Sequence, residues 1–550
     1  MSLASKFFAW RNKIKPATHR VKKSADNIVT SFDDTKLLTD IYFPLGAKTT
    51  KNGPFPTILI RTAYKRAGFA NYARIYAERG FITILQACRG TDGSGGKIGP
   101  LLLEREDGLA TLDWLKKQDW FDGRLGMSGP SYLGYVQWAI CDAMPEKSAI
   151  ATQIATTEYQ NVLFPQGATN LQFFLSWMQL TQGLASSPLK FMFGVISGKV
   201  ERNTKSAANT LPMIEADVAA TGSEVEFWRR WMLKEVKKPE HWRELSQSGR
   251  INNETPPNSF VSGWYDYIID ELIDDYNRLR NQGHNPYLTI GPWTHVDPKL
   301  IAQSVHDTLA WMKAKLKDDA SDLRENPVKI FIPGLDQWRE YETYPPPGAK
   351  QEILYLGPQN SLNSTGQETA DPANYTYDPN DATPNLGGAI FAFTGAGAFD
   401  NRPLEARDDV LAFTSQPLEK SATLIGQPRV KLFAKSSLEH TDFMARLCDV
   451  DQNGKSINIC DGFVRITPKN SKKLPDGSWE IDILLHNSAH QFASGHRLRL
   501  QICSGAHPKI SRNPGVEEEV DKIPEFLVAK QSIFFDKKRP SSINLPLYDL

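Results

Sequence analysis

The first third of the chain alternates short apolar runs with stretches of helical periodicity. FPTILIRT (55–62) and FITILQACRG (81–90) predict strands, and GRLGMSG (123–129) predicts another. Between them, DGLATLDWLKKQ (107–118) predicts a helix, because its apolar residues recur on one face. Strands that alternate with helices favour a mostly parallel sheet, so we expect the α/β class.

Two later regions have a different texture. From residue 158 to 250 the pattern is helical and rich in bulky residues, as in LQFFLSWMQL (171–180), which predicts a helical cap inserted into the sheet domain. Beyond Pro345, strand-like runs follow a segment rich in Asn, Gly, Pro and Thr, which predicts an all-β sandwich of jelly-roll type. The expected domains are an α/β domain (1–157 and 251–345), a helical cap (158–250) and a C-terminal jelly roll (346–550).

Composition excludes several classes of function. The chain has 550 residues with 64 basic and 63 acidic side chains. The resulting net charge of +1 gives no global attraction to nucleic acid. Five widely spaced cysteines without a C-x-x-C pair signal neither a zinc site nor a disulfide framework, and favour reduced cysteines in a cytoplasmic protein. The glycines of GTDGSGG (90–96) are not followed by G-K-[ST], so they are not a P-loop. We expect no metal and no cofactor.

The N-terminal segment is locally basic, with no Asp or Glu before Asp26. It lacks the apolar core and cleavage site of a secretory signal. LASKFFAWRNKIK (3–15) could form an amphipathic helix at a membrane surface, but we expect it to pack on the body of the protein or to fray. A homodimer stays open.

The stretch RLGMSGPSYLGY (124–135) predicts a strand that runs into a tight turn with two serines. An acyl-transfer serine needs an exposed hydroxyl, a base and donors for the developing oxyanion. A sharp strand–turn–helix exposes the hydroxyl, and glycines allow the close approach of the two backbones. Ser131 fits this better than Ser128, because Gly129 and Gly134 flank it and an apolar helix follows.

An acid and a base follow at later strand ends. Asp266 closes SFVSGWYD and His295 closes YLTIGPWTH, which gives the order Ser, acid, His of a hydrolase sheet. Each residue alone is weak evidence for catalysis, because a histidine at a strand end is more often structural and an Asp in a loop is usually a cap or turn residue. Together with the serine turn they indicate a nucleophilic serine site.

Three motifs carry a resemblance to a known family. GPSYLG (129–134), GWYD (263–266) and GPWTH (291–295), in this order, resemble the bacterial cocaine esterase and X-prolyl dipeptidyl peptidase group of α/β-hydrolases. That family's nucleophile lies in a G-x-S-Y-x-G turn, which explains the departure from G-x-S-x-G. The resemblance covers nearly the whole chain, from RTAYKR (61–66) to ASGHRLRLQICSGAHPKISRN (493–513).

The resemblance implies a role for each matching residue. Ser131 matches the nucleophile, Asp266 the triad acid and His295 the base. The hydroxyl of Tyr64 and the backbone N–H of Tyr132 match the oxyanion donors. The implied substrate contacts, which would equally suit a helix–helix core, are Trp177, Phe164, Phe391 and Leu133.

Three functions compete, two of them hydrolytic and one from another class. The favoured one is a serine esterase acting on small carboxylic esters, among them aryl esters. The second is an amide hydrolase, either an X-prolyl dipeptidyl aminopeptidase or an amino-ester or β-lactam acylase; such peptidases usually carry an extra N-terminal helical domain, whereas the hydrolase pattern here starts near Asp26. The third is a binding protein with a lectin-like jelly roll and a dead hydrolase domain, but no triad member is lost.

Overall fold

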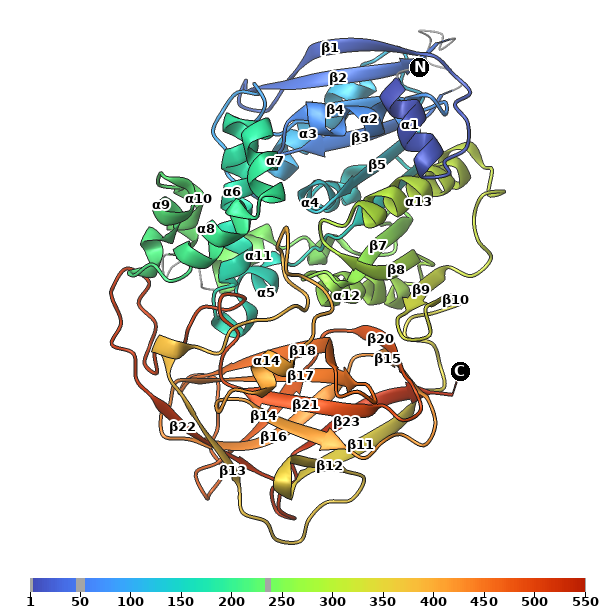
Figure 1. Cartoon of the computed structure of the whole chain (residues 1–550). Coiled ribbons are helices and arrows are strands. Elements are labelled where there is room, and N and C mark those ends of the chain that lie inside the picture. The colour runs from blue at the N-terminus through green and yellow to red at the C-terminus, as the bar shows by residue number, and fades with distance from the viewer. Residues whose placement is uncertain (1–2, 46–54, 233–238, 550) are drawn as a thin grey trace.

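The computed structural model describes residues 3–45, 55–232 and 239–549. Figure 1 shows an α/β layer at the N-terminal end of the molecule, a group of helices beside it and a β-rich domain at the other end. No helix within the described ranges is long and apolar enough to span a bilayer.

One ten-stranded sheet organises the α/β layer, in the order β1-β2-β4-β3-β5-β6-β7-β8-β9-β10. Strands β4 to β9 along this order run parallel, while β1, β2 and β10 are antiparallel to their neighbours. The α/β class is thereby confirmed. The bounds are β1 Val21–Thr30, β2 Lys36–Pro44, β3 Thr57–Thr62, β4 Ile82–Ala87, β5 Leu125–Pro130, β6 Ser148–Gln153, β7 Asn258–Tyr265, β8 Tyr287–Thr294, β9 Val328–Ile332 and β10 Gln337–Tyr341.

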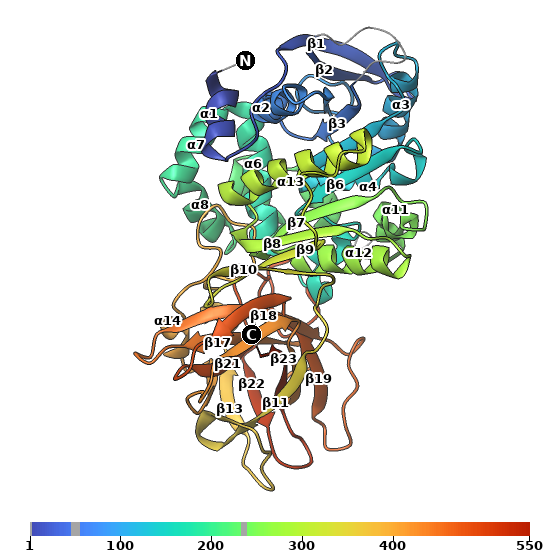
Figure 2. The same ribbon diagram turned by 90° about the vertical axis from the view of Figure 1, so that its right-hand side faces the viewer.

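Helices cover both faces of this sheet (Figure 2). Apolar side chains of α2 and α13 join one buried core, and those of α3 and α12 join the core on the other face. Helix α1 packs on α2 through the ring of Phe8, which meets Tyr72 edge-on. The bounds are α1 Leu3–Arg11, α2 Arg66–Ala77, α3 Glu104–Lys116, α4 Tyr132–Trp138, α12 Ile269–Asn281 and α13 Pro298–Lys317.

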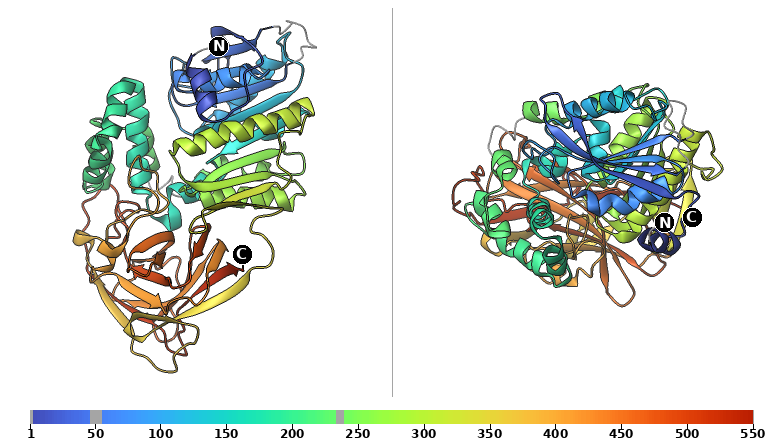
Figure 3. Two further views of the ribbon diagram at one scale, coloured as in Figure 1. Left: turned by 45° about the vertical axis from the view of Figure 1, so that its right-hand side comes forward. Right: turned by 90° about the horizontal axis from the view of Figure 1, so that it is seen from above.

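Between β6 and β7 the chain leaves the sheet and forms a helical cap, which stands to one side of the sheet above the β-rich domain (Figure 3). Its longest helix, α6, buries Phe173, Phe174 and Trp177 against the other cap helices and the sheet domain. The bounds are α5 Tyr159–Leu163, α6 Leu171–Ser186, α7 Pro188–Ile196, α8 Lys199–Ala207, α9 Ala216–Thr221, α10 Glu226–Met232 and α11 Pro239–Leu245.

The C-terminal region is a β-rich domain of thirteen strands with its own apolar core, and one short helix, α14 (Arg402–Glu405). A loop before β14 reaches out of it and places Phe391 against Phe173 of the cap and His295 of the sheet domain. The bounds are β11 Lys350–Gly357, β12 Ser361–Asn363, β13 Ala373–Tyr377, β14 Leu411–Ser415, β15 Ala422–Gly426, β16 Arg429–Ser436, β17 Thr441–Val450, β18 Ser456–Ile466, β19 Trp479–Leu484, β20 Ser488–Phe492, β21 Arg497–Cys503, β22 Ala529–Phe534 and β23 Ser542–Tyr548.

Candidate active site

Ser131 lies on a sharp turn between β5 and α4, with φ of 58° and ψ of −122°. A non-glycine residue with positive φ is strained and persists only where the surroundings fix it. The flanking glycines make the turn possible: a Cβ on Gly129 would lie 2.4 Å from Leu133 Cβ, and one on Gly134 would lie 2.2 Å from Ala155 Cβ. The turn therefore holds the Ser131 side chain at the carboxyl end of the parallel strands.

A chain of hydrogen bonds runs from Ser131 through His295 to Asp266. His295 Nε2 lies 3.1 Å from Ser131 Oγ, and its Nδ1 lies 2.9 Å from Asp266 Oδ1. Ser131, Asp266 and His295 directly follow β5, β7 and β8. In the sheet β7 and β8 are neighbours, and β6 lies between β5 and β7. The structure brings these predicted residues within hydrogen-bonding distance.

Asp266 is fully buried and its carboxylate has further donors. The Ser262 hydroxyl donates to Oδ2 at 3.3 Å, and the backbone N–H of Ile268 donates to Oδ1 at 3.2 Å. A buried carboxylate is costly unless it is hydrogen-bonded. These bonds fix the carboxylate opposite His295, which then has one ring nitrogen left for Ser131.

Tyr64 lies in the loop after β3, and its hydroxyl oxygen accepts a hydrogen bond from Trp177 Nε1 at 3.1 Å. An indole N–H can only donate, so the tyrosine proton is left for another acceptor, and Ser131 is the side chain within its reach. Burial raises the pKa of Tyr64, because it disfavours the charged form. The hydroxyl therefore stays protonated near neutral pH and can donate.

Tyr132 contributes a second free donor. Its backbone N–H opens α4, and no group in the described part of the chain accepts a hydrogen bond from it. Its side chain points the other way: the hydroxyl donates to Glu104 at 2.8 Å and accepts from the N–H of Leu101 at 3.0 Å. Glu104 is paired in turn with buried Arg61 at 3.0 Å. This buried set anchors the residue that follows Ser131.

Ser128, the other serine of the turn, has a different environment. It lies inside β5 and is 3% exposed. Its hydroxyl is 3.2 Å from Thr308 Oγ1 and 3.5 Å from the Tyr76 hydroxyl, on the side of α13 and α2. Ser128 is thus a core residue beneath the turn, without a histidine partner among the described residues.

A narrow pocket opens beside Ser131, and the side chains that line it are uncharged. Its volume of about 20 Å³ holds little more than one water. Of the predicted substrate contacts only Trp177 lines it, while Phe391 packs on the ring of His295 with 5.1 Å between centroids. Phe164 packs on Phe174 and Trp242, and Leu133 is buried against Gly129. The lining residues are Tyr64, Leu101, Ser131, Tyr132, Tyr159, Leu163, Phe173, Trp177, Trp231 and Tyr267.

A larger cleft of about 630 Å³ lies next to this pocket, and Tyr64 lines both. The cleft runs between the loop after β3, the loop at 90–98 and cap helices α6 and α10. Its charged lining residues are Lys65, Asp92, Glu224 and Glu226. Tyr64 therefore stands where a group in the cleft would meet Ser131.

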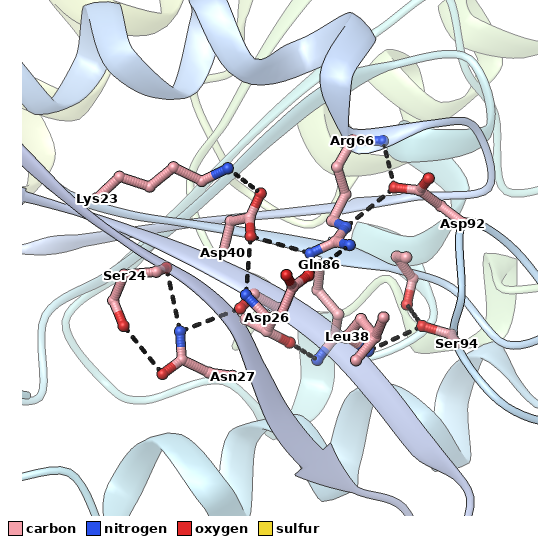
Figure 4. Close-up of polar contacts among 12 residues, drawn as sticks. Lys23, Ser24, Asp26, Asn27, Leu38, Asp40, Arg66, Gln86, Asp92 and Ser94 are labelled. Atoms are coloured by element: carbon pink, nitrogen blue, oxygen red, sulfur yellow. Dashed lines mark hydrogen bonds and ion pairs between the residues drawn. The ribbon is translucent and has the colours of Figure 1, made fainter.

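The wall of the cleft is fixed by a charged cluster around Arg66 (Figure 4). The guanidinium donates to Asp92, Asp40 and Asp26, each at 3.0 Å, and its backbone N–H also donates to Asp92, at 2.9 Å. Lys23 adds an ion pair to Asp40 at 2.8 Å. The cluster ties the β1–β2 hairpin to the start of α2, two residues after Tyr64, and to the loop at 90–98.

Six pocket residues were not predicted: the aliphatic Leu101 and Leu163, and the aromatic Tyr159, Phe173, Trp231 and Tyr267. Tyr267 directly follows Asp266, and its ring lies 4.8 Å from that of His295, so its position in the motif was the available signal. The three cap aromatics carry no such signal, because helical periodicity does not show which face meets Ser131. In the described ranges no group of His, Cys, Asp and Glu is arranged to hold a metal ion.

Two family models match consecutive parts of the chain. Residues 33–297 match X-Pro dipeptidyl-peptidase (S15 family), and residues 321–544 match the X-Pro dipeptidyl-peptidase C-terminal non-catalytic domain. The first match contains Ser131, Asp266 and His295, and the second covers the β-rich domain.

Relatives are similar over nearly their whole length. A cocaine esterase of Rhodococcus sp. (strain MB1 Bresler) is 27% identical over 583 residues, which cover 95% of this chain and 98% of the relative. An α-amino acid ester hydrolase structure superposes with a TM-score of 0.80 at 21% identity, covering 97% of this chain and 98% of the other. An aminopeptidase structure from a marine sediment Thaumarchaeota archaeon gives 0.79 at 20% identity, with the same coverage. The chain is therefore a hydrolase of the cocaine esterase and X-prolyl dipeptidyl peptidase-like family of α/β-hydrolases.

Proposed function

We propose that this hydrolase cleaves small carboxylic esters, among them aryl esters, through an acyl-enzyme on Ser131. His295 Nε2, 3.1 Å from Ser131 Oγ, accepts the hydroxyl proton as the oxygen attacks the ester carbonyl. Asp266 accepts a hydrogen bond from Nδ1, which keeps the other nitrogen free as a base and stabilises the imidazolium that forms. Tyr267 and Phe391 enclose the ring and hold it in place.

The developing oxyanion would lie between the Tyr64 hydroxyl and the N–H of Tyr132. Both groups have a proton to donate, since Trp177 supplies a donor to the Tyr64 oxygen and no described group accepts from the N–H of Tyr132. Donors that are already oriented stabilise charge without reorganising during the reaction. The buried contacts of the Tyr132 side chain with Glu104 fix that N–H.

Collapse of the tetrahedral intermediate breaks the bond to the leaving oxygen. The imidazolium of His295 returns its proton to that oxygen, so the alcohol or phenol departs neutral and the acyl group stays on Ser131. Water then attacks the acyl carbonyl, His295 takes one of its protons, and the same donors bind the second oxyanion. As the bond from the acyl carbon to Ser131 Oγ breaks, the imidazolium of His295 returns the proton to Oγ and the carboxylic acid leaves.

The uncharged pocket beside Ser131 is the observation that carries this proposal. The described side chains that line it are aromatic, aliphatic or hydroxyl-bearing, and none is a carboxylate. The pocket therefore suits a neutral acyl group rather than one that carries an ammonium. Its small volume favours short or flat acyl groups, and even these require the aromatic side chains that line the pocket to move. The larger cleft on the other side of Tyr64 would take the leaving group.

A panel of p-nitrophenyl and alkyl esters that vary in acyl length tests the proposal. We expect kcat/KM to fall as the acyl chain lengthens, and Ser131→Ala to lower kcat by about 10⁴-fold or more. Ser128→Ala is the matched control and should keep kcat, because its hydroxyl faces Thr308 and Tyr76. Full activity in Ser131→Ala would refute the assignment of the nucleophile, and labelling of Ser131 by a fluorophosphonate would support it.

Amide hydrolysis is the second candidate, and the carboxylates of the cleft favour it. Asp92, Glu224 and Glu226 could bind a substrate ammonium, as a dipeptidyl peptidase or an amino-ester or β-lactam acylase requires. Asp92 and Glu224 are already paired with Arg66 and Arg229, whereas Glu226 has no ion-pair partner among the described residues. Turnover of an Xaa-Pro-anilide comparable to that of a nitrophenyl ester, and lost in Glu226→Gln, would reverse the ranking.

A further inference from the structure

A second cavity, which shares no lining residue with the Ser131 pocket, lies between the segment after α1, the end of α2 and α13 from His306 onward. Its volume is about 350 Å³, large enough for a small organic molecule. Apolar groups form much of its wall, and five charged side chains line it, four of them basic. The lining residues are Ile14, Lys15, Pro16, Thr18, Arg79, Phe81, His306, Leu309, Ala310, Lys313, Lys317 and Asp322.

Two of the four basic residues are neutralised within the protein. Lys15 and Lys313 both pair with Asp322, and Lys313 also pairs with Asp319 at 2.9 Å. These carboxylates compensate the charge at the outer side of the cavity. Of the other two cations, Arg79 pairs with Glu78 at 3.8 Å, which leaves Lys317 as the one that needs a further partner.

Lys317 has no carboxylate partner in the described part of the chain. Its ammonium donates to the carbonyl oxygen of Arg79 at 3.0 Å and lies 4.0 Å from the centroid of the Phe81 ring. An ammonium has three protons to donate, so two remain for a ligand. Burial, reinforced by the charges of Arg124 and Lys313, lowers the pKa of Lys317 to about 8, which a bound anion would oppose.

Arg79 adds a second positive charge to the cavity wall, but this charge is compensated within the protein. Its side chain is 8% exposed, and the buried carboxylate of Glu78 lies 3.8 Å away as its ion-pair partner. Its guanidinium also donates to the carbonyls of Lys15 and Ile75. Burying a cation is costly unless a counter-charge or good hydrogen bonds compensate it. Arg79 meets both conditions, whereas Lys317, half-buried beside the same apolar wall, has no carboxylate partner in the described part of the chain.

We propose that this cavity binds an amphiphilic monocarboxylate. Its carboxylate would lie at Lys317, in the field of Arg79, and its hydrocarbon body would pack on the apolar wall around Leu309 and Ala310. Hydrogen bonds between an ammonium and a carboxylate are about twice as strong as neutral ones, and the apolar wall adds burial of the hydrocarbon. A free fatty acid and the aryl acid released from an ester share this chemistry.

Calorimetric titration of the full-length chain tests the proposal, with sodium octanoate and sodium benzoate as alkyl and aryl probes. We expect one molar equivalent of one of them to bind, and Lys317→Met to weaken it roughly tenfold. Lys315→Met is the matched control: Lys315 lies on the same helix, over the ring of Trp311 and outside the cavity lining, so binding should be unchanged. Octanol tests the need for the charge, and inorganic phosphate tests the need for the apolar body; both should bind at least tenfold more weakly.

A second variant separates ligand binding from folding. His306→Glu places a carboxylate at the exposed mouth of the cavity, where it would compete with the ligand for the cations without removing any core group. It should weaken the same probe. Equal binding by the wild type, Lys317→Met and His306→Glu would overturn the proposal, because the probe would then occupy another site such as the Ser131 pocket. Octanol or phosphate binding as tightly as the carboxylate would overturn it as well.

Discussion

Helix α13 connects two sites that differ in how far their polar and charged groups are compensated within the protein. At its N-terminal end the chain has just passed His295, whose two nitrogens are both engaged and whose surroundings are aromatic. At its C-terminal end, about 30 Å away along its 20 residues, Lys317 is half-buried and has no carboxylate partner in the described part of the chain. The first site satisfies its polar groups within the protein and so fixes a geometry for chemistry. The second leaves charge uncompensated, which is why we infer a ligand there and a reaction at Ser131.

Asp266→Asn is expected to have the largest effect on the first site. An amide in place of the carboxylate cannot accept from Nδ1–H as an anion does, so His295 loses its orientation and the imidazolium its stabilisation. We expect kcat for a nitrophenyl ester to fall by about 10⁴-fold. Ser262→Ala, which removes only one 3.3 Å donor to the same carboxylate, should cost much less. Retention of a tenth of wild-type kcat in Asp266→Asn would place the acid elsewhere.

Tyr64→Phe removes one of the two oxyanion donors and leaves the ring. We expect kcat to fall by about 10²–10³-fold with little change in KM, because the lost bond forms in the transition state. Tyr72→Phe is the control, since Tyr72 lies on α2, after Tyr64 in the chain, and packs among aromatic rings. Equal loss in both variants would point to packing rather than to the oxyanion.

Trp177→Phe tests the hydrogen bond that frees the Tyr64 proton. An aromatic ring is kept, though a smaller one, and the 3.1 Å donor to the Tyr64 oxygen is lost. Hydrogen bonds in a chain polarise one another, so we expect a loss in kcat of about tenfold, smaller than that of Tyr64→Phe. In the Tyr64→Phe background the same change should have little further effect on kcat, and an additive loss would show that Trp177 acts through the acyl pocket instead.

Tyr132→Phe tests whether the buried hydroxyl positions the second donor. The variant leaves Glu104 and the N–H of Leu101 without that partner, which should lower the free energy of unfolding by about 1–3 kcal/mol. Tyr135→Phe, on the same helix, removes a hydroxyl that bonds Leu245 and Gln247 and should cost a similar amount of stability. Only Tyr132→Phe should lower kcat, and equal kcat in the two variants would show a purely structural role.

The residues at strand ends could be predicted from sequence, and the pocket could not. Ser131, Asp266 and His295 each follow an apolar run with clear strand character, and parallel strands end at one edge of a sheet. The β1–β2 hairpin was missed because VKKSADNIVT is largely exposed and carries lysines and an Asp, so it lacks an apolar pattern. Strand β6 (SAIATQ) is fully buried, but its small and polar residues gave no strand signal.

The pocket depends on contacts between segments that are distant in sequence. Phe164 and Trp177 come from the same cap, and both carry an aromatic ring in an apolar stretch. Only the packing of α6 against Tyr64 distinguishes them, which no local periodicity records. Phe391 reaches His295 from a loop of the β-rich domain, nearly a hundred residues further along the chain. The cavity at Lys317 is invisible in sequence for the same reason, because three separate segments enclose it.

The smallest expected effect concerns the stability of the second site. The pKa of Lys317 is about 8 in the folded protein, whereas an unfolded lysine titrates near 10.4. Between these values the unfolded state binds more protons, so the free energy of unfolding contributed by this group rises with pH. Below about pH 8 the half-buried ammonium is charged and faces the cations Arg124 and Lys313, with Asp319 as the opposing charge.

Lys317→Met should therefore be more stable than the wild type at pH 7, and the difference should shrink as the pH approaches 10. Thermal unfolding at several pH values measures it, with Lys299→Met, at an exposed site on the same helix, as the control. The other titratable groups that line the cavity are present in all three proteins and cancel in the comparison; they are Lys15, Arg79, His306, Lys313 and Asp322. A saturating carboxylate probe should reverse the order at pH 7, because it stabilises only a folded state that has its ammonium. If Lys317→Met remains more stable than the wild type with the probe present, Lys317 is a strained residue and not part of a binding site.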